Sequence, residues 1–318
     1  MADSHARRAR VVVIGACNMD LVSYVPRFPQ PGETLHGTRF ITSFGGKGAN
    51  QAVMAAKLGA EVWMVGKVGR DVFGEDMLKN FRCWGVHTTY VYQADGVASG
   101  VAPIAVDAEG RNAIIIVTGA NDQLTCEEVT AACSVIAQAD VVVGQLEIPL
   151  EPTLAALRAA RDAGVRTIFN PAPARPSLPA ACYELSDLFC PNEHEAALLT
   201  GMPVETLAQC EAAARALLAR GPRGVILTLG ARGSLLVDPT QVVHVPARQV
   251  RAVDTTGAGD AFIGSLACLL GEGWPLGDAV RVASAIATQS VLAPGAQSSF
   301  PTRAELVAAG ILGREAPE

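Results

Sequence analysis

The 318-residue chain contains no run of 18 consecutive apolar residues, so we expect no membrane partner. It has no basic excess either. Its 25 lysines and arginines stand against 31 aspartates and glutamates, and the resulting formal charge of −6 argues against nucleic acid as a partner. Residues 1–10 are polar and basic and lack the apolar stretch of a secretory signal, so we expect them to form a disordered tail.

Motifs of the common zinc sites are missing too. The eight cysteines form no C-x-x-C pair and the five histidines form no H-E-x-x-H, which argues against a zinc ribbon or a zinc protease. Most cysteines lie in apolar or helical surroundings, where a free thiol packs as a small apolar group. We therefore expect reduced thiols and a cytoplasmic location, or a nuclear one in a eukaryote.

What the chain does have is a repeated strand and helix pattern. Half of its residues are apolar, and short β-branched runs such as 11–14 and 141–143 alternate with helical segments such as 154–163. Thr125 and Glu128 have the spacing of a capping box, which predicts a helix running to Ala139. The pattern predicts an α/β fold, in which a mostly parallel central sheet carries helices on both faces.

Two segments break this pattern. Residues 20–42 are rich in proline, glycine and aromatic residues, and residues 100–118 read as a hairpin with strands at 101–106 and 113–117. We expect both to form one small β-sheet that projects from a single domain spanning residues 11–312. Because such a sheet has open edges and an apolar face, we expect it to pair with a second copy in a homodimer.

The most informative segment is the glycine-rich turn DTTGAGD at residues 254–260, which precedes the helical run 261–270. Its small residues let the backbone turn tightly and let a ligand approach it closely. The N–H groups at the start of the following helix favour an anion. A carboxylate beside an anion site suits a base that takes a proton from an attacking hydroxyl, although Asp260 could also simply cap the helix.

A second glycine-rich stretch, SFGGKGANQ at residues 43–51, opens a helical run that we expect at residues 52–58. It is not a Walker A loop, because no Ser or Thr follows Gly-Lys. It is not a convincing dinucleotide fingerprint either, because the third glycine is missing. The polar groups of Lys47 and Asn50 suit hydroxyl groups better than a pyrophosphate, and the alternative is a plain helix-initiating loop.

Together, FGGKGANQA and VDTTGAGDAF resemble the ribokinase-like (pfkB) carbohydrate kinases. The resemblance extends from residue 11 to residue 301. Shorter segments support it by their order and spacing: GACNMDL (15–21), PGET (31–34), QLE (145–147), NPAP (170–173), NEHE (192–195), TLGARG (228–233) and GAQSS (295–299). It implies a kinase that transfers phosphate from ATP to a sugar, with O5 of D-ribose as the expected acceptor and the small sheet as a lid over the sugar. The alternatives are a kinase for another sugar or nucleoside, such as deoxyribose or fructose, and a non-catalytic sugar- or nucleotide-binding regulator.

The resemblance also implies site residues. Asp260 would be the base, and in the turn that begins at Gly257 the N–H groups of Ala258, Gly259 and Asp260 would hold the transferred phosphoryl group. The sugar would be bound by side chains and backbone at Asn18, Asp20, Gly46, Lys47, Gly48, Asn50, Glu147 and Asp260. Simpler explanations stay open for several of them: an Asx-turn at Asn18 and Asp20, a solvated loop acid at Glu147 and a surface charge at Lys47.

For the nucleotide and its Mg²⁺, the resemblance implies Asn192, Glu195, Thr228, Gly230, Ala231, Gly233, Gly259 and Ser284. Glu193 and Glu195 could equally be acids that complement a helix dipole. Family members often carry Asn or His in place of Ser284, which puts nucleotide selectivity in doubt. A potassium loop is implied at Asp254, Thr256, Ser290, Ala293, Gly295 and Ser299, where oxygen donors suit a hard cation. The alternative is that Asp254 caps a turn.

Overall fold

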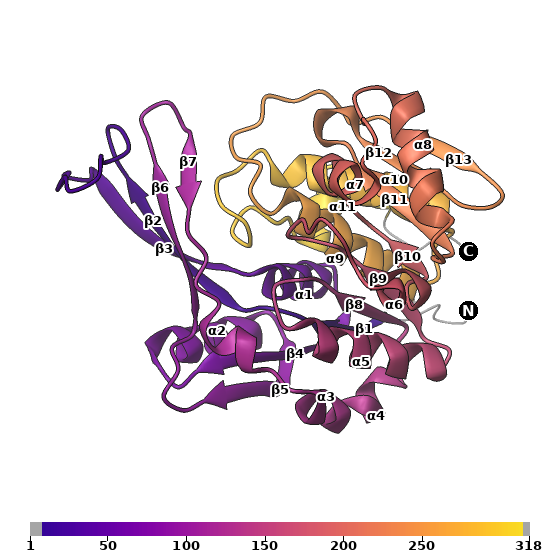
Figure 1. Ribbon diagram of the computed structural model, residues 1–318, viewed down its shortest axis with the longest axis horizontal. Coiled ribbons are helices and arrows are strands. Elements are labelled where there is room, and N and C mark those ends of the chain that lie inside the picture. The colour runs from indigo at the N-terminus through magenta and orange to yellow at the C-terminus, as the bar shows by residue number, and fades with distance from the viewer. Residues whose placement is uncertain (1–7, 314–318) are drawn as a thin grey trace.

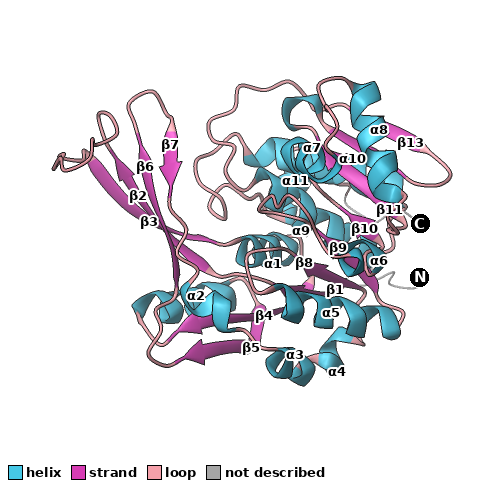
Figure 2. Cartoon of the chain, viewed as in Figure 1, coloured by secondary structure: helices cyan, strands magenta, loops and turns pink. Residues whose placement is uncertain are grey.

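The computed structural model describes residues 8–313, in which nine strands form one large sheet and four form a small one (Figures 1 and 2). The strands of the large sheet are β1 (Arg10–Ile14), β4 (Glu61–Gly69), β5 (Val86–Ala94), β8 (Val141–Gly144), β9 (Arg166–Phe169), β10 (Leu188–Phe189), β11 (Gly224–Thr228), β12 (Ser234–Val237) and β13 (Val242–Val245). The expected central sheet is therefore confirmed. The part of the expected tail at residues 1–7 lies outside the described residues. Arg10 belongs to β1, so the domain begins before residue 11.

The large sheet has the order β13-β12-β11-β10-β9-β8-β1-β4-β5, and only β12 runs antiparallel to the other strands; β13 pairs antiparallel with β12 at the edge. The chain moves from β1 towards β4 and β5 and later returns to the other side of β1 with β8. Strand order therefore reverses between β1 and β8. Open α/β sheets bind ligands at the carboxyl ends of the strands beside such a reversal.

Helices cover both faces of the sheet because successive residues of each buried strand point to opposite sides. In β1, Val11 and Val13 pack with one cluster of apolar residues, and Val12 and Ile14 pack with another. The helices of the first cluster are α1 (Lys47–Lys57), α2 (Val72–Cys83), α9 (Ala258–Gly271), α10 (Leu276–Ser290) and α11 (Arg303–Ala308). Those of the second are α3 (Cys126–Ala131), α4 (Cys133–Ile136), α5 (Leu150–Asp162), α6 (Ala180–Glu184), α7 (Glu193–Thr200) and α8 (Leu207–Leu218). The 3₁₀ turns are η1 (Gly119–Gln123) and η2 (Gly230–Arg232).

The predicted small sheet is present and stands away from the body of the molecule (Figure 1). Its strands, in the order β3-β2-β6-β7, are β2 (Asn18–Tyr24), β3 (Arg39–Gly45), β6 (Gly100–Val106) and β7 (Asn112–Ile114). The second hairpin strand, predicted to residue 117, pairs regularly only to Ile114 opposite Ile104, and beyond it Val117 forms an isolated antiparallel bridge with Val101. The residue next to Ile104 is Pro103, which accepts a hydrogen bond from the N–H of Ile115 but has no N–H to return one.

Three helix boundaries also differ from the prediction. Helix α1 begins at Lys47 instead of residue 52, so the second half of the glycine-rich stretch opens the helix, while residues 43–45 end β3. Helix α5 begins at Leu150, directly after Pro149, which suits an entry to a helix. The capping box of Thr125 and Glu128 is present, but the helix behind it is interrupted at Ala132 and continues as α4 only to Ile136. None of the helices in the described part of the chain has the length and apolar character of a membrane span.

Candidate active site

Helix α9 begins at the carboxyl-end edge of the sheet with two unpaired backbone donors. Gly257 has φ +76°, a conformation that side chains disfavour, and a Cβ there would lie 2.8 Å from Cβ of Ala296. The N–H of Ala258 donates to the carbonyl of Thr255 at 3.2 Å. Within residues 8–313, the N–H groups of Gly259 and Asp260 have no hydrogen-bond partner. Both N–H groups can therefore donate hydrogen bonds to a bound anion. The expected anion site thus has two free donors instead of three.

The carboxylate of Asp260 is buried and held at both oxygens. The side-chain amide of Asn50 donates to Oδ2 and that of Gln51 donates to Oδ1, each at 2.9 Å. Both donors come from the first turn of α1, whose N-terminus therefore faces that of α9. Each carboxylate oxygen has two lone pairs, so one on each oxygen stays available for a hydroxyl proton. Asp260 does not cap the start of α9 through its side chain, since no such hydrogen bond is formed there.

Lys47 and Glu147 lie beside Asp260. The backbone N–H of Lys47 donates to Oε2 of Glu147 at 2.8 Å, which joins the start of α1 to the loop after β8. Burial alone would lower the pKa of the Lys47 ammonium, but the carboxylates of Asp260, Glu147 and Glu195 raise it above its ordinary value. Burial likewise raises the pKa of Glu147, although Lys47 opposes this. Neither residue is a solvated surface charge.

Asn18 and Asp20 lie on β2, where the small sheet joins the body. Oδ1 of Asn18 accepts a hydrogen bond from the amide of Asn121 at 2.8 Å, which leaves the amide group of Asn18 for another partner. Burial, with Glu147 and Asp260 nearby, raises the pKa of Asp20 to about 7. The two residues stand in a regular strand, which excludes the simple Asx-turn.

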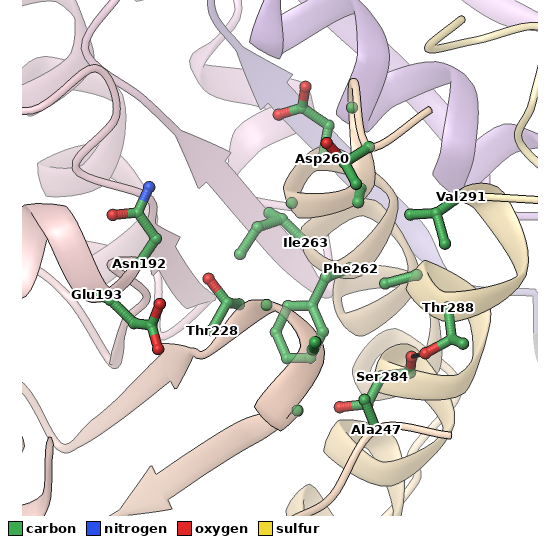
Figure 3. Close-up of a pocket in the computed structure, with 18 of the residues that line it drawn as sticks. Asn192, Glu193, Thr228, Ala247, Asp260, Phe262, Ile263, Ser284, Thr288 and Val291 are labelled. Carbon is green, nitrogen blue, oxygen red and sulfur yellow. Dashed lines mark hydrogen bonds between the residues drawn. The ribbon is translucent and has the colours of Figure 1, made fainter. Parts of the chain in front are cut away.

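A cavity of about 590 Å³ extends from Lys47 and Asp260 along the sheet edge to Ser284 and Val291 on and after α10 (Figure 3). Asn192 and Thr228 lie along its side, and Phe262 and Ile263 of α9 form part of its apolar wall. All eight residues expected at the nucleotide line it: Asn192, Glu195, Thr228, Gly230, Ala231, Gly233, Gly259 and Ser284. Asn18, Asp20 and Glu147 are not among its lining residues and lie on the small-sheet side of Asp260. Asp260 thus stands between a polar region and a long cavity.

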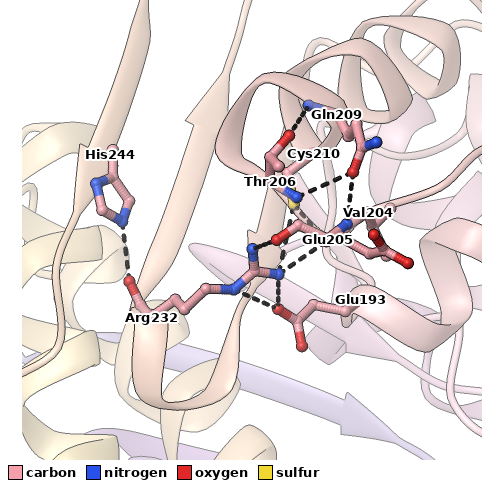
Figure 4. Close-up of polar contacts among 8 residues, drawn as sticks. All are labelled: Glu193, Val204, Glu205, Thr206, Gln209, Cys210, Arg232 and His244. Carbon is pink, nitrogen blue, oxygen red and sulfur yellow. Dashed lines mark hydrogen bonds and ion pairs between the residues drawn. The ribbon is translucent and has the colours of Figure 1, made fainter.

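Asn192 and Glu195 form a reciprocal capping box at the start of α7. The side chain of Asn192 accepts from the N–H of Glu195, and Oε2 of Glu195 accepts from the N–H of Asn192, both at 2.8 Å. The helix start is held to η2 by Arg232, which pairs with Glu193 and donates to the carbonyl of Val204 at 2.8 Å (Figure 4). Burial raises the pKa of Glu195. Both residues therefore have a structural role and face the cavity as well.

A family model described as "pfkB family carbohydrate kinase" matches residues 8–303. The chain belongs to this family. It is 46% identical over 302 residues to the ribokinase of Mus musculus, covering 94% of each chain, and 42% identical to the deoxyribokinase of Salmonella typhi, covering 92% of this chain and 95% of that one. Its fold matches the structure of Arabidopsis thaliana ribokinase complexed with ribose and ATP, with a TM-score of 0.89, 31% identity, and coverage of 97% and 100%. The family inferred from the sequence is confirmed.

In this pfkB kinase, the far end of the cavity is lined by hydroxyl groups. Oγ of Ser284 lies 2.8 Å from Oγ of Ser234, and both residues are buried. Thr288, one turn further along α10, donates its hydroxyl to the carbonyl of Ser284 at 2.9 Å. Ser284 and Thr288 thus bring short polar side chains to this end of the cavity.

The loop expected to hold potassium is brought together by Asp254. Its Oδ1 accepts from the N–H and hydroxyl of Thr256 at 2.9 and 2.7 Å, and its Oδ2 accepts from the N–H of Gly295 at 2.8 Å. Burial would raise the pKa of Asp254, but these hydrogen bonds hold it below its ordinary value. The hydroxyls of Ser290 and Ser299 donate to the carbonyls of Ala287 and Ala296, so their oxygens stay able to accept a cation.

The sequence did not point to several buried amides around Asp260. Gln51 contacts Asp260 directly and accepts a hydrogen bond from Gln145 at 2.6 Å. Asn121 positions Asn18, and Gln297 donates to Asn50 at 3.0 Å. Gln51, Gln145 and Gln297 stand inside segments that carried the family resemblance, and this was the sequence signal that could have found them. Gly48, expected at the sugar, is a packing residue in this structure, since a Cβ there would lie 2.6 Å from the backbone of Gly15.

Proposed function

We propose that this pfkB kinase transfers the γ-phosphoryl group of ATP to O5 of D-ribose, giving D-ribose 5-phosphate and ADP. The observation that carries the proposal is the buried Asp260, fixed by two amides beside the free N–H groups of Gly259 and Asp260. A base and an anion site at one point are what in-line phosphoryl transfer to a hydroxyl requires. The relatives named ribokinase support ribose as the acceptor.

In the proposed mechanism, the sugar lies between the small sheet and Asp260, with hydroxyls on Asn18, Asp20, Asn50 and Glu147. Asp260 takes the proton of the attacking sugar hydroxyl while the oxygen of that hydroxyl bonds to the γ-phosphorus. At the same time the bond between the γ-phosphorus and the bridging oxygen of the β-phosphate breaks, and ADP leaves. The N–H groups at the start of α9 and the ammonium of Lys47 stabilise the charge on the phosphoryl oxygens. The triphosphate runs past Asn192 and Thr228, and the adenine occupies the far end of the cavity, between the apolar wall of α9 and Ser284.

The residues present suit the metal ions that the family implies. Glu195 is an acid in the cavity wall with one oxygen engaged by Asn192, and its other oxygen can bind a water of Mg²⁺, which would neutralise phosphate charge. The ionised Asp254, with the carbonyls and hydroxyls of the loop, forms an oxygen-only donor set that suits K⁺. We include both ions in the proposal.

A coupled ADP-release assay with a panel of sugars tests the proposal. We expect D-ribose to give the highest kcat/KM among ribose, 2-deoxyribose, fructose and nucleosides. Preference for 2-deoxyribose would favour the second candidate, a deoxyribokinase, which the Salmonella typhi relative supports. Tight binding of sugar and ATP without any ADP release would indicate a non-catalytic regulator and contradict the proposal.

Asp20 gives a pH-dependent prediction. Its pKa is raised to about 7, so it is protonated below that pH in the empty site and ionised above it. Because an ionised carboxylate accepts two hydroxyl donors and a protonated one accepts fewer, we expect the KM for ribose to rise about threefold as the pH falls from about 7.5 to about 6.5, as one-proton linkage predicts. Asp20→Asn should have a high KM that does not change over this range. Identical pH profiles for the two proteins would contradict the assignment.

The small sheet supports the expected homodimer. Phe40 and the run Ile114–Val117 are exposed on it, with 61% of Phe40 and 65% of Ile115 accessible. A group of large apolar side chains exposed on one small sheet is typical of an interaction surface. We predict a dimer of about twice 33.0 kDa by light scattering at micromolar concentration. Ile115→Lys should shift it to the monomer, whereas Val242→Lys, an exposed apolar site on β13, should not. A monomeric wild-type protein would contradict the prediction that two copies pair through the small sheet.

A further inference from the structure

Three side-chain amides form a line from helix α2 to the catalytic carboxylate. Nδ2 of Asn80 donates to Oε1 of Gln297 at 2.8 Å, Nε2 of Gln297 donates to Oδ1 of Asn50 at 3.0 Å, and Nδ2 of Asn50 donates to Asp260 at 2.9 Å. Gln297 and Asn50 are 6% and 5% exposed. In such a buried position, water cannot substitute for a missing partner, so the orientation of each amide matters.

The direction of this line is fixed at its Asp260 end. An ionised carboxylate only accepts hydrogen bonds, so Asn50 must turn its NH₂ group towards Asp260. Its carbonyl oxygen then faces Gln297, which must in turn present an NH₂ group. Gln297 therefore selects one of the two orientations of the Asn50 amide. In the opposite orientation, the oxygen of Asn50 would face the oxygen of Asp260.

Gln297 is itself held rigidly. Nζ of Lys57 donates to the backbone carbonyls of Gln297 and Phe300 at 2.8 and 2.7 Å, and it lies 4.4 Å from the ring centroid of Trp84. Two residues earlier, Gly295 is bound to Asp254. The side chain of Gln297 thus connects the loop at residues 293–299 with the base on α9.

We infer that Gln297 is a positioning residue for phosphoryl transfer: it orients the amide of Asn50 so that this amide holds Asp260 in the geometry needed to accept a proton. Gln297 acts through Asn50 and touches neither reactant. The inference rests on the proposed function, because it assigns Asp260 as the base.

Two substitutions of similar shape separate orientation from packing. Gln297→Glu keeps the acceptor for Asn80 but turns an oxygen towards the oxygen of Asn50, which favours the wrong orientation of that amide. Gln297→Met keeps the volume and has no preference for either orientation. We expect kcat to fall about tenfold in Gln297→Glu and about threefold in Gln297→Met, within the range for a mispositioned group. The KM for MgATP should stay within about twofold of wild type. Ser298→Ala, which alters an exposed neighbour in the same loop, should leave both unchanged.

A purely structural role predicts the reverse order, since the more polar glutamate fits the polar site better than methionine. Wild-type kcat in Gln297→Glu, or a lower kcat in Gln297→Met than in Gln297→Glu, would therefore overturn the inference. If the wild-type protein phosphorylates no sugar, the proposed function fails, and the orientation is decided by NMR. The side-chain ¹⁵N–¹H signals of Asn50 should then shift in Gln297→Glu and not in Ser298→Ala. Unshifted signals would overturn the inference.

Discussion

Asp260→Asn is expected to lower turnover at least about 100-fold while ribose and ATP still bind. Loss of a general base typically reduces the rate by about 10²–10⁴-fold, and an amide of the same shape does not accept a proton at neutral pH. The side chain is buried between Asn50 and Gln51, so the substitution also places an NH₂ group opposite one of these two donors. The lost proton acceptor and the altered contacts with Asn50 and Gln51 both weaken activation of the attacking hydroxyl. Neither changes the contacts of the adenine, which lies at the other end of the cavity.

The measurement pairs steady-state kinetics with calorimetric titration of each ligand. The dissociation constant for ATP should stay within about threefold of wild type, because the contacts that ATP makes before the reaction are unchanged by the substitution. Asp238→Asn is a matched control, because Asp238 also accepts a hydrogen bond from a side-chain amide, that of Gln241 at 3.0 Å, but closes an exposed turn directly after β12. Near-wild-type turnover in Asp260→Asn would remove the residue from the role of base, while loss of turnover together with loss of all binding would point to misfolding.

The fold was predictable because its signals are local. Apolar runs such as 11–14 and the capping box at Thr125 and Glu128 depend on residues close together in the chain, and both were predicted correctly. The end of β7 was missed because it depends on Pro103, which lies across the strand pair. The local sequence pattern thus predicts helices and strands well, but it predicts poorly which residues of two strands pair with each other.

The same distinction explains the candidate site. The motifs located Asp260 and Lys47 because each stands in a short glycine-rich stretch of unusual composition. The amides of Gln145 and Gln297 contact the site from positions 94 and 247 residues away from their partners on α1. Gln145 and Gln297 lie in segments that carried the resemblance, but that signal gives no contact, so only the folded chain shows that four amides converge near one carboxylate. The roles of all these residues remain predictions.

Potassium is expected to raise turnover about 10- to 100-fold over sodium, within the usual range of coupling between two sites. The ionised Asp254 would bind it together with Thr256, the hydroxyl of Ser299 and the carbonyls near Ser290, Ala293 and Gly295. This is a donor set of oxygens alone, which suits a hard cation. Sodium prefers shorter distances to oxygen than a cage built for potassium allows. Because hydrogen bonds from Thr256 and Gly295 hold the pKa of Asp254 below its ordinary value, the carboxylate stays charged and the response should not change between about pH 6 and pH 8.

The ion would act on the base through contacts that the structure already contains. Asp254 binds Gly295, Gln297 binds Asn50, and Asn50 binds Asp260, so ordering the loop also orders the base. The effect should therefore appear in kcat and not in the KM for ribose. Initial rates are compared in KCl, NaCl and tetramethylammonium chloride at equal ionic strength. Asp254→Asn, which keeps the shape and removes the charge, should reduce the difference between the salts, whereas Asp238→Asn should preserve it. Equal rates of the wild-type enzyme in all three salts, with contaminating potassium removed, would return Asp254 to the role of a residue that closes a turn.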